Sequence, residues 1–481
     1  MATEQSFNIP DYPNIIAGEE SAEGGRVIIR NPYDLSPLGA VFDATPAEAE
    51  RAIAAAHRAF EKTRRIPAHE RKAILTRLRD LVLWHAPKFA ELLCRENAKP
   101  IALCRAELAR VADTLTLSAE EAGRLTGEFL PFDSAPGGEG RFGIARRFPL
   151  GPVAAITPFN FPLNLLAHKI GPALAVGAPV VHKPCVQAPL TAFEFARLVY
   201  ESGWPQDAYS VIYAQPDAAQ LLVTDGRIKV LSFTGSDAVG WKLKSLAGKK
   251  RVLLELGGSA SCIIEPDMPD RDTALSRCVN GAFAYSGQVC ISIQRLMVSD
   301  EIYDTFVPQF VERAKKLTLG DPMSQDTSIG PVIDDSAAER IEKWVREAEA
   351  AGARILTGKY LGNRMFEPYI LENVPATCEL GCNEIFGPVV ALYRYGTLDE
   401  AIALTNASRY GLQSGLFTSN ISKAFRAFEQ LEVGGLMINE VPGWRTDGMP
   451  YGGTKDSGVG REGPRYAIED YTEIRLLAIK Q

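Results

Sequence analysis

Between residues 150 and 257 the sequence alternates short apolar runs with amphipathic stretches of helical length, and this alternation limits the fold more than any other feature. The apolar runs predict strands at 153–156, 180–182, 211–213, 230–233 and 252–256, with helices near 164–175, 190–202, 217–223 and 237–246. Strands joined by helical crossovers form a parallel sheet with helices on both faces. In such sheets, ligands bind at the carboxyl ends of the strands, so we expect binding residues there.

The rest of the chain adds further structural units. A chain of 481 residues exceeds what one hydrophobic core usually organises, so we expect two or three domains. Helical periodicity precedes the alternation over 47–92 and 101–124, and a second α/β region runs from 261 to 439. The segment 131–143 is rich in Gly, Pro and Ser and marks a boundary or an excursion. The tail 471–480 alternates β-forming residues and is suited to add a strand to another subunit's sheet.

Composition and charge exclude several classes of partner. A formal net charge of -7 is unsuited to nucleic acid or an anionic membrane, so we expect a small-molecule partner. The N-terminal segment has no basic region followed by an apolar run, which favours a cytoplasmic location. Eight cysteines are too few for a disulfide scaffold of this length, and the five histidines and the Cys378 and Cys382 pair lack metal-ligand spacing. We therefore expect free thiols and no metal site.

Residues that can carry chemistry follow the predicted strands. Cys290, in YSGQVCISIQR, is either a nucleophilic thiolate or an inert buried thiol. Glu255 ends the last strand of the alternation, where desolvation raises a carboxyl pKa toward that of a general base; an ion pair at the sheet edge is the alternative. The FTGS turn at 233–236 opens a helix, so it either binds a phosphate or simply caps the helix. Two GxGxxG strings, at 138–143 and 458–463, follow no such strand and are not interpreted as dinucleotide fingerprints.

Taken together, the motifs resemble those of the aldehyde dehydrogenase superfamily, from about Ile29 to Ile479. They are FPLGPVAAITPFNFP, HKP, FTGS, ELGG, GQVC, EIFGPVV and MPYGGTKDSGVGREG, in the family's order. The resemblance implies an α/β fold with three parts: a Rossmann-like parallel-sheet cofactor domain (1–125 and 147–255), an α/β catalytic domain (256–455) and a small β bridging and oligomerisation element (126–146 and 456–481). It also implies a homodimer or homotetramer.

The resemblance further implies the oxidation of an aldehyde to a carboxylic acid with NAD, through a thiohemiacetal and a thioester on Cys290. Asn160 and the backbone N–H of Cys290 would hold the oxyanion, and Glu255 would activate the hydrolytic water. Lys169 and Glu462 match positions associated with proton handling, with an ordinary ion pair as the alternative. The residues implied to bind the cofactor follow the strand ends: Ile156, Thr157, Pro158, Phe159, Lys183, Phe233, Gly235, Ser236, Leu256, Glu384 and Phe386.

The choice of cofactor and substrate depends on other positions. Val186 stands where many NAD-using relatives carry a Glu that binds the adenosine ribose and repels a ribose phosphate, so NADP stays open beside NAD. The resemblance points to small polar aldehydes such as lactaldehyde, glycolaldehyde, succinate semialdehyde or phosphonoacetaldehyde. Arg445, Arg105 and Arg110 are candidates to bind an anionic group, with a solvated or structural arginine as the alternative, and Phe161 offers no charge that would favour a phosphonate.

Two other functions stay open. One is a CoA-acylating dehydrogenase, and Glu255 disfavours it because relatives of that type often lack this Glu. The other is a catalytically silent nucleotide-binding protein of the same fold, since a fold alone does not establish a function. The joint presence of Cys290, Glu255 and Asn160 disfavours this second alternative.

Overall fold

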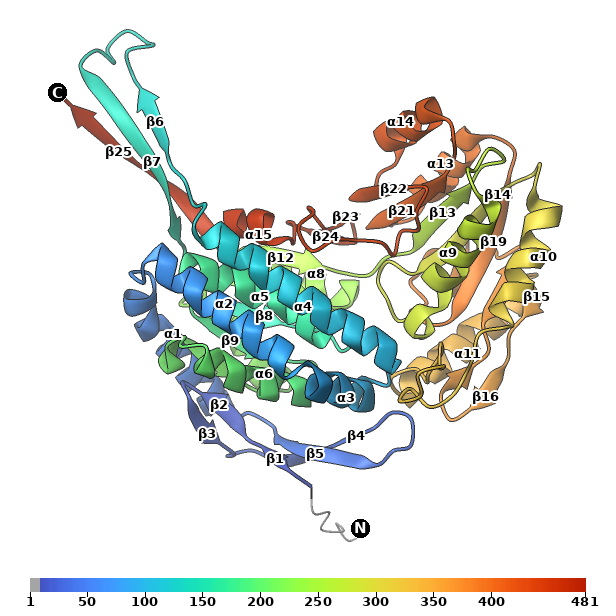
Figure 1. Cartoon of the computed structure of the whole chain (residues 1–481), viewed down its shortest axis with the longest axis horizontal. Coiled ribbons are helices and arrows are strands. Elements are labelled where there is room, and N and C mark those ends of the chain that lie inside the picture. The colour runs from blue at the N-terminus through green and yellow to red at the C-terminus, as the bar shows by residue number, and fades with distance from the viewer. Residues whose placement is uncertain (1–8) are drawn as a thin grey trace.

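The computed structural model describes residues 9–481, and its first large unit is an eight-stranded sheet (Figure 1). The strand order is β24-β12-β11-β8-β9-β10-β2-β3. The five central strands are β12 (Arg251–Glu255), β11 (Val230–Thr234), β8 (Val153–Ile156), β9 (Val180–Lys183) and β10 (Tyr209–Val211). They are mutually parallel, which confirms the predicted alternation; β10 is shifted by two residues and β12 by one residue from the predicted positions.

Helices cover both faces of this sheet. The crossover helices are α5 (Pro162–Val176), α6 (Leu190–Glu201), α7 (Pro216–Thr224) and α8 (Asp237–Leu246). Every residue of α5 is buried, because α2 (Ala68–Trp84) and α4 (Ile101–Ala122) pack over it. Two further N-terminal helices are α1 (Pro46–Thr63), which contacts α7, and α3 (Ala86–Asn97), which contacts α4. Within residues 9–481, no helix has both the length and the apolarity needed to cross a bilayer.

Short strands that the sequence pattern did not predict complete the edges of the sheet. They are β2 (Asn14–Ile16) and β3 (Glu19–Ser21) at one edge and β24 (Gly458–Val459) at the other. A separate three-stranded sheet consists of β1 (Asp11–Tyr12), β5 (Pro37–Phe42) and β4 (Arg26–Arg30). β24 and α15 (Pro464–Tyr471) contact β12, so part of the segment expected to bridge subunits packs against the first sheet instead.

The second unit is a seven-stranded sheet of order β15-β18-β19-β14-β13-β21-β22, parallel except for β15. Its strands are β13 (Ala260–Ile264), β14 (Ile293–Ser299), β15 (Arg354–Thr357), β18 (Tyr369–Glu372), β19 (Val389–Tyr395), β21 (Gln413–Phe417) and β22 (Gly435–Ile438). Its helices are α9 (Arg271–Phe283), α10 (Tyr303–Ala314), α11 (Asp335–Ala350), α12 (Glu379–Cys382), α13 (Leu398–Asn406) and α14 (Ile421–Gln430). Two strand pairs complete it: β16 (Tyr360–Gly362) with β17 (Met365–Phe366), and β20 (Tyr410–Gly411) with β23 (Thr454–Lys455).

A three-stranded arm projects away from both units (Figure 1). It consists of β6 (Glu128–Pro131), β7 (Arg141–Pro149) and β25 (Thr472–Lys480). All nine residues of β25 pair with β7 of the same chain, so the predicted C-terminal strand exists but its partner lies within the chain. β25 is an edge strand of this arm, and the outward edge has no partner within the described residues.

Candidate active site

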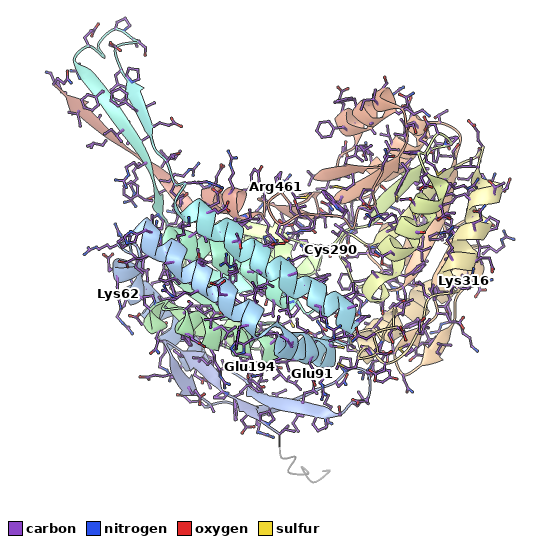
Figure 2. The ribbon with its side chains drawn as sticks, in the orientation of Figure 1. Lys62, Glu91, Glu194, Cys290, Lys316 and Arg461 are labelled. Carbon is purple, nitrogen blue, oxygen red and sulfur yellow. The ribbon has the colours of Figure 1, made fainter. Side chains whose placement is uncertain are left out.

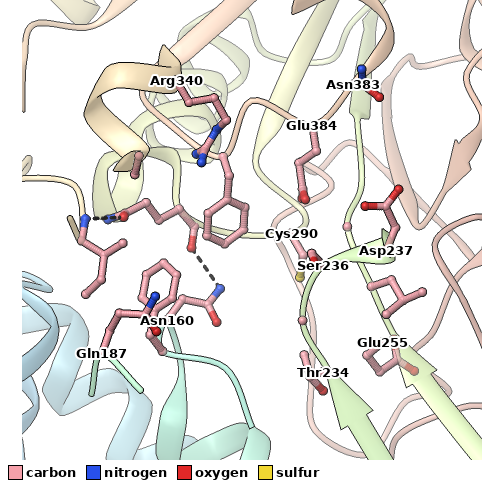
Figure 3. Close-up of a pocket in the computed structure, with 18 of the residues that line it drawn as sticks. Asn160, Gln187, Thr234, Ser236, Asp237, Glu255, Cys290, Arg340, Asn383 and Glu384 are labelled. Carbon is pink, nitrogen blue, oxygen red and sulfur yellow. Dashed lines mark hydrogen bonds between the residues drawn. The ribbon is translucent and has the colours of Figure 1, made fainter. Parts of the chain in front are cut away.

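A cavity of about 420 Å³ lies where the carboxyl ends of β8, β11 and β12 face loops of the second sheet. Figure 2 places Cys290 between the two large units, and Figure 3 shows the cavity wall. Nine of the residues predicted for the site line this wall: Phe159, Asn160, Gly235, Ser236, Glu255, Leu256, Cys290, Glu384 and Phe386. The fold therefore brings together, from both units, residues that are up to 227 positions apart in the sequence (159 to 386).

An unusual backbone turn presents Cys290 to the cavity. Tyr285, Ser286 and Gly287 all have left-handed backbones, with φ of 51°, 55° and 68°. A Cβ at Gly287 would come within 2.1 Å of the Gly387 carbonyl oxygen, so only glycine allows this loop to approach EIFGP so closely. The Ser286 hydroxyl donates to the Gly330 carbonyl at 2.7 Å and helps to hold the turn. Strain of this kind is typical of functional loops.

Cys290 is partly buried, and its thiol lies close to one hydroxyl group. Burial raises the pKa of this thiol to about 12, while a hydrogen bond with Tyr451 acts in the opposite direction. The Tyr451 hydroxyl lies 3.1 Å from Cys290 Sγ. Because the thiol is the resting form at neutral pH, Cys290 needs a base when it reacts.

Glu255 offers such a base at the end of β12. Glu255 is 4% exposed, and neither of its carboxyl oxygens has a hydrogen-bond partner among the described residues. Burial and, to a smaller extent, the nearby charge of Glu462 raise the pKa of the Glu255 carboxyl well above its usual value. A Cβ at Gly452 would come within 2.9 Å of Glu255 Oε1, so glycine at that position leaves room for the carboxyl. The structure shows no ion pair at Glu255 within residues 9–481, which favours the general-base interpretation.

Asn160 lies just before α5 and faces the loop that carries Cys290. Its Nδ2 donates to the Gln288 carbonyl oxygen at 3.0 Å, as Figure 3 shows. Gln288 was not singled out from the sequence, although it belongs to the GQVC motif. Its side-chain oxygen accepts from the Ile333 N–H at 2.9 Å, and its buried Nε2 has no partner in the described part of the chain. The cavity wall therefore holds a second amide donor beside Asn160.

Lys169 and Glu462 form a buried ion pair outside the cavity wall. Lys169 Nζ lies 3.0 Å from Glu462 Oε1 and donates to Thr234 Oγ1 at 2.7 Å, with both charged side chains at most 2% exposed. Burial raises the pKa of Glu462, but Lys169, His168 and Arg445 together outweigh it and the net pKa is lowered. The charges of this pair act on Glu255, and a role for the two residues in proton handling stays a prediction.

The predicted cofactor residues form one side of the cavity. Glu384 accepts from the Gly258 N–H at 2.9 Å, and burial raises the pKa of its carboxyl to about 8. A Cβ at Gly257 would lie 2.3 Å from Glu384 Oε2, so the ELGG glycines admit this carboxyl. The rings of Phe159 and Phe386 meet edge to face at 5.8 Å.

Other predicted residues lie outside this wall. Five cofactor candidates lie at or just after the ends of β8, β9 and β11: Ile156, Thr157, Pro158, Lys183 and Phe233. Phe161 packs beneath Lys99, whose Nζ is 3.8 Å from the ring centroid. Arg105 lines a different cavity of about 610 Å³ and donates to Gln325 at 2.7 Å in an exposed position. Arg105 therefore does not line the cavity that holds Cys290, and a role for it in substrate binding stays a prediction.

Arg445, by contrast, lies beside the nucleophile. Its Cζ is 3.8 Å from the centroid of the Tyr451 ring, its side chain is 6% exposed, and its buried Nε has no partner among residues 9–481. Its Nη2 lies 2.7 Å from His168 Nε2, which in turn lies 2.9 Å from Asp447 Oδ1. Arg110 makes two hydrogen bonds to Asp447, at 2.7 and 3.1 Å, so its guanidinium is held by that carboxylate.

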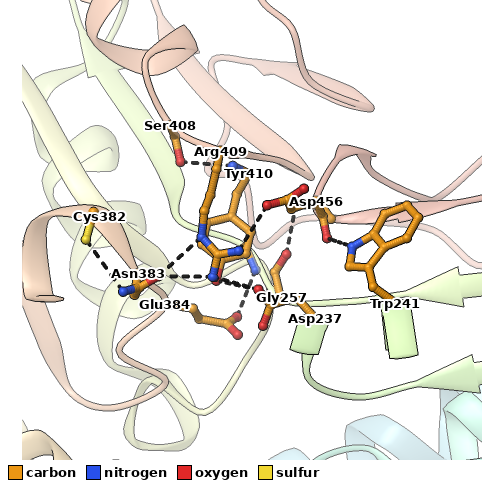
Figure 4. A network of polar contacts seen from close by, with 12 residues as sticks. Asp237, Trp241, Gly257, Cys382, Asn383, Glu384, Ser408, Arg409, Tyr410 and Asp456 are labelled. Carbon is orange, nitrogen blue, oxygen red and sulfur yellow. Dashed lines mark hydrogen bonds and ion pairs between the residues drawn. The ribbon is translucent and has the colours of Figure 1, made fainter. Parts of the chain in front are cut away.

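A polar network that the sequence did not predict ties the two units together at the cavity rim (Figure 4). Arg409 lies 2.6 Å from Asp237 at the start of α8 and 3.0 Å from Asp456. It also donates to Asn383 Oδ1 at 3.0 Å and lies over the Tyr410 ring, 4.4 Å from its centroid. Asp237, Asn383, Arg409 and Tyr410 line the cavity. The network therefore fixes the position of α8 relative to the second sheet.

The fold and the site define a class of protein: a nucleotide-type α/β protein whose cavity holds a cysteine thiol and a buried carboxyl group. Residues 19–477 match the model of the aldehyde dehydrogenase family. The 3-sulfolactaldehyde dehydrogenase of Priestia megaterium is 40% identical, over 98% of this chain and 98% of its own. The chain therefore belongs to the aldehyde dehydrogenase family and is an NAD(P)-dependent aldehyde dehydrogenase, as its motifs predicted.

Solved structures agree with this assignment. Aldehyde dehydrogenase 21 of Physcomitrella patens, solved in complex with the reaction product succinate, has a TM-score of 0.97 and 40% identity, over 98% of this chain and 99% of its own. The glyceraldehyde-3-phosphate dehydrogenase of Methanocaldococcus jannaschii, solved with NADP, has a TM-score of 0.91 and 35% identity, over 95% of this chain and 99% of its own. The predicted fold class is confirmed.

Proposed function

We propose that the enzyme oxidises a short aldehyde bearing an anionic group to the carboxylic acid, with Cys290 as nucleophile, NAD or NADP as oxidant and water as acyl acceptor. The observation that carries the proposal is the buried Arg445 guanidinium next to Cys290, with an Nε that has no partner among the described residues. A buried donor without a partner is costly, and an anionic substrate would satisfy it.

The arrangement around Arg445 also limits the length of the substrate. Tyr451 contacts Cys290 through its hydroxyl and Arg445 through its ring face. Since the Tyr451 side chain alone spans the distance between Cys290 and Arg445, an aldehyde that contacts both residues has a chain of only a few atoms. The names of the similar proteins, with a sulfonate or succinate group, agree with such a substrate. Asp447 holds Arg110 through two hydrogen bonds at 2.7 and 3.1 Å, whereas Arg445 lies 3.8 Å from the same carboxylate, so we assign Arg110 to positioning and Arg445 to substrate binding.

The chain's own groups support the first half of the reaction. Glu255 takes the proton as Cys290 Sγ bonds to the carbonyl carbon, and the oxyanion is held by Asn160 Nδ2 and the backbone N–H of Cys290. The cavity fits a dinucleotide, because α8 begins at its wall and glycines at 235 and 257 leave it open. Gly235, Ser236 and Glu384 would hold NAD(P) there, and the cofactor would supply the hydride acceptor that the conversion of the Cys290 adduct to a thioester requires.

Glu255 passes the proton that it took from Cys290 to bulk solvent and then acts a second time. Its carboxylate accepts a proton from a water molecule that attacks the thioester carbonyl, the carbon–sulfur bond breaks, and the acid leaves with Cys290 as thiolate. Transfer of the acyl group to CoA is the competing outcome, and identification of the product distinguishes the two.

Turnover of matched aldehydes tests the proposal. We expect succinate semialdehyde and sulfoacetaldehyde to be oxidised at higher kcat/KM than butanal, with the free acid as product and no CoA added. Arg445→Met should lower kcat/KM for the anionic aldehydes by about 10- to 100-fold more than for butanal, because butanal loses only the effect of the Arg445 charge on Cys290 and not a charged hydrogen bond. Equal loss for both kinds of aldehyde, or turnover only with CoA, would refute the proposal.

We also propose that both NAD and NADP are accepted. Val186 is partly buried against the core of the first unit and offers no carboxylate to the adenosine ribose. A valine neither binds the ribose hydroxyls nor repels a ribose phosphate. Comparison of kcat/KM for the two cofactors tests this, and a preference above about 1000-fold for either one would contradict it.

We further propose that the chain forms a homodimer or homotetramer in the cytoplasm. Large apolar side chains are exposed on the arm and on α14: Phe129, Ile474, Leu476, Leu477, Ile421, Phe425 and Phe428. Exposed apolar groups beside an open strand edge are typical of contacts between subunits. All eight cysteines are free, as a reducing compartment allows. Light scattering of the purified protein tests the subunit number, and a monomer at micromolar concentration would contradict it.

A further inference from the structure

We infer that Tyr451 is a catalytic residue: its phenol donates a hydrogen bond to the Cys290 sulfur and stabilises the thiolate, both before attack on the aldehyde and when the thioester breaks. This rests on the proposed role of Cys290 as nucleophile and adds a group that touches the reacting sulfur. The sequence motifs did not point to Tyr451, whose hydroxyl meets a side chain 161 positions away.

The backbone and the core fix the position of the Tyr451 hydroxyl. The Tyr451 N–H donates to the Glu462 carbonyl at 3.1 Å, and the Glu462 N–H donates back to the Tyr451 carbonyl at 2.7 Å. The ring is 2% exposed and packs in a small cluster with Ile291 and Leu412. Because the ring is held on all sides, its hydroxyl is directed at Sγ at 3.1 Å rather than at solvent.

The phenol is suited to donate and not to accept at that sulfur. Burial, followed by the neighbouring Cys290, raises the pKa of Tyr451 well above its usual value, so the phenol keeps its proton over the range in which the enzyme works. The Arg445 guanidinium lies 3.8 Å from the ring centroid. A cation on the ring face draws electron density from the ring and strengthens the hydroxyl as a donor.

The remaining charges around Cys290 show why one hydroxyl matters. The groups that act on its thiol come from four different segments: Tyr451, Glu384, Arg445 and Glu255. The groups that act on Glu255 in turn are Glu462, Lys169, Arg445 and Arg461. Among the groups that act on Cys290, the carboxyl groups of Glu384 and Glu255 disfavour its thiolate, whereas Tyr451 and Arg445 favour the thiolate. When an anionic substrate neutralises the charge of Arg445, Tyr451 is the group among these four that still favours the Cys290 thiolate.

The proton balance of the step is simple. The Cys290 proton passes to the Glu255 carboxylate as the carbon–sulfur bond forms, and Tyr451 keeps its own proton throughout. When the thioester carbon–sulfur bond breaks, the sulfur leaves as a thiolate and accepts the same hydrogen bond again.

Alkylation of Cys290 by iodoacetamide in the substrate-free enzyme tests the inference. Tyr451→Phe keeps the ring beneath Arg445 and removes only the hydroxyl. A hydrogen bond to a charged group corresponds to about one to two pH units in the thiol pKa, partly offset by the greater nucleophilicity of a more basic thiolate. We therefore expect alkylation of Cys290, followed by mass spectrometry, to slow by about 3- to 10-fold at each pH between 7 and 9. The acidic limb of the kcat/KM profile should move to higher pH.

Tyr200→Phe is the matched control, because it removes another partly buried phenol hydrogen bond, to the Tyr209 carbonyl at 2.8 Å, away from the cavity. It should alkylate and turn over as the parent does. NADPH binding by Tyr451→Phe, measured by fluorescence, shows that the variant is folded. An unchanged alkylation rate and an unchanged pH profile in Tyr451→Phe would overturn the inference. Slower alkylation in a protein that oxidises no aldehyde would instead refute the proposed function and leave the inference standing.

Discussion

Replacement of Glu255 by glutamine separates the two halves of the proposed reaction. The substitution keeps the shape of the side chain and breaks no hydrogen bond, since both carboxyl oxygens are unpartnered among the described residues. It removes the one group at the cavity wall that we assign to accept a proton from water. A positioned general base contributes about 10²- to 10⁴-fold, which equals about 3 to 5 kcal/mol of barrier at 1.36 kcal/mol for each tenfold.

Stopped-flow absorbance of the reduced cofactor measures this effect. If hydrolysis of the thioester depends on Glu255, Glu255→Gln should form up to one reduced cofactor per active site in a first phase and then turn over at least 100-fold more slowly than the parent. Because Glu255 also takes the Cys290 proton in the proposed reaction, this first phase should itself be slower than in the parent. Mass spectrometry of the quenched protein should find the acyl group on Cys290.

The control and the refuting result use a second buried carboxylate. Glu265 is 4% exposed and accepts from the Tyr395 hydroxyl at 2.6 Å, but it does not line the cavity. Glu265→Gln should therefore keep the steady-state rate of the parent. If Glu255→Gln turned over at the rate of the parent and no acyl group accumulated on Cys290, the role assigned to Glu255 would be refuted.

Two further substitutions test other parts of the structure. Val186→Glu should lower the ratio of kcat/KM for NADP to that for NAD by at least about tenfold, since a carboxylate opposes the ribose phosphate; Val186→Gln, without the charge, should change it less. Lys169→Met leaves Glu462 buried and unpaired, so urea denaturation should show a loss of about 3 to 5 kcal/mol, against less than about 1 kcal/mol for Lys88→Met at an exposed pair. The pKa of Glu462 is lowered in the folded protein from 4.5, so the pair stabilises above that pH and its contribution is lost as the pH falls below it.

The sequence predicted the five parallel strands because each is a run of apolar residues, and the burial of β8 and β11 on both faces explains that pattern. It missed β2, β3 and β24 because two or three residues are too few to show a period. The candidate nucleophile, base and amide donor were placed correctly in one cavity because they belong to motifs with a family resemblance.

The sequence could not show which side chains face one another across the site. Arg105 and Arg110 lie five residues apart on α4, so at 3.6 residues per turn they point to different sides of the helix. Arg110 reaches Asp447 and Arg105 reaches Gln325, and no local pattern distinguishes them. The contact of Tyr451 with Cys290 is likewise a tertiary contact that depends on the second sheet being folded against the first.

Arg445, Tyr451 and Cys290 together link recognition of the substrate to the reactivity of the nucleophile. Arg445 contacts the His168 ring, and His168 contacts the Asp447 carboxylate. Arg110 on α4 forms an ion pair with the same carboxylate. An anionic group that binds Arg445 therefore meets a guanidinium whose position is fixed before binding, and little ordering is needed. Because the same guanidinium lies on the Tyr451 ring, binding at one end of a short aldehyde changes the electrostatics at the sulfur that attacks the other end. Selectivity for an anionic aldehyde should then be visible in kcat as well as in KM, which is expected where binding energy acts on the transition state.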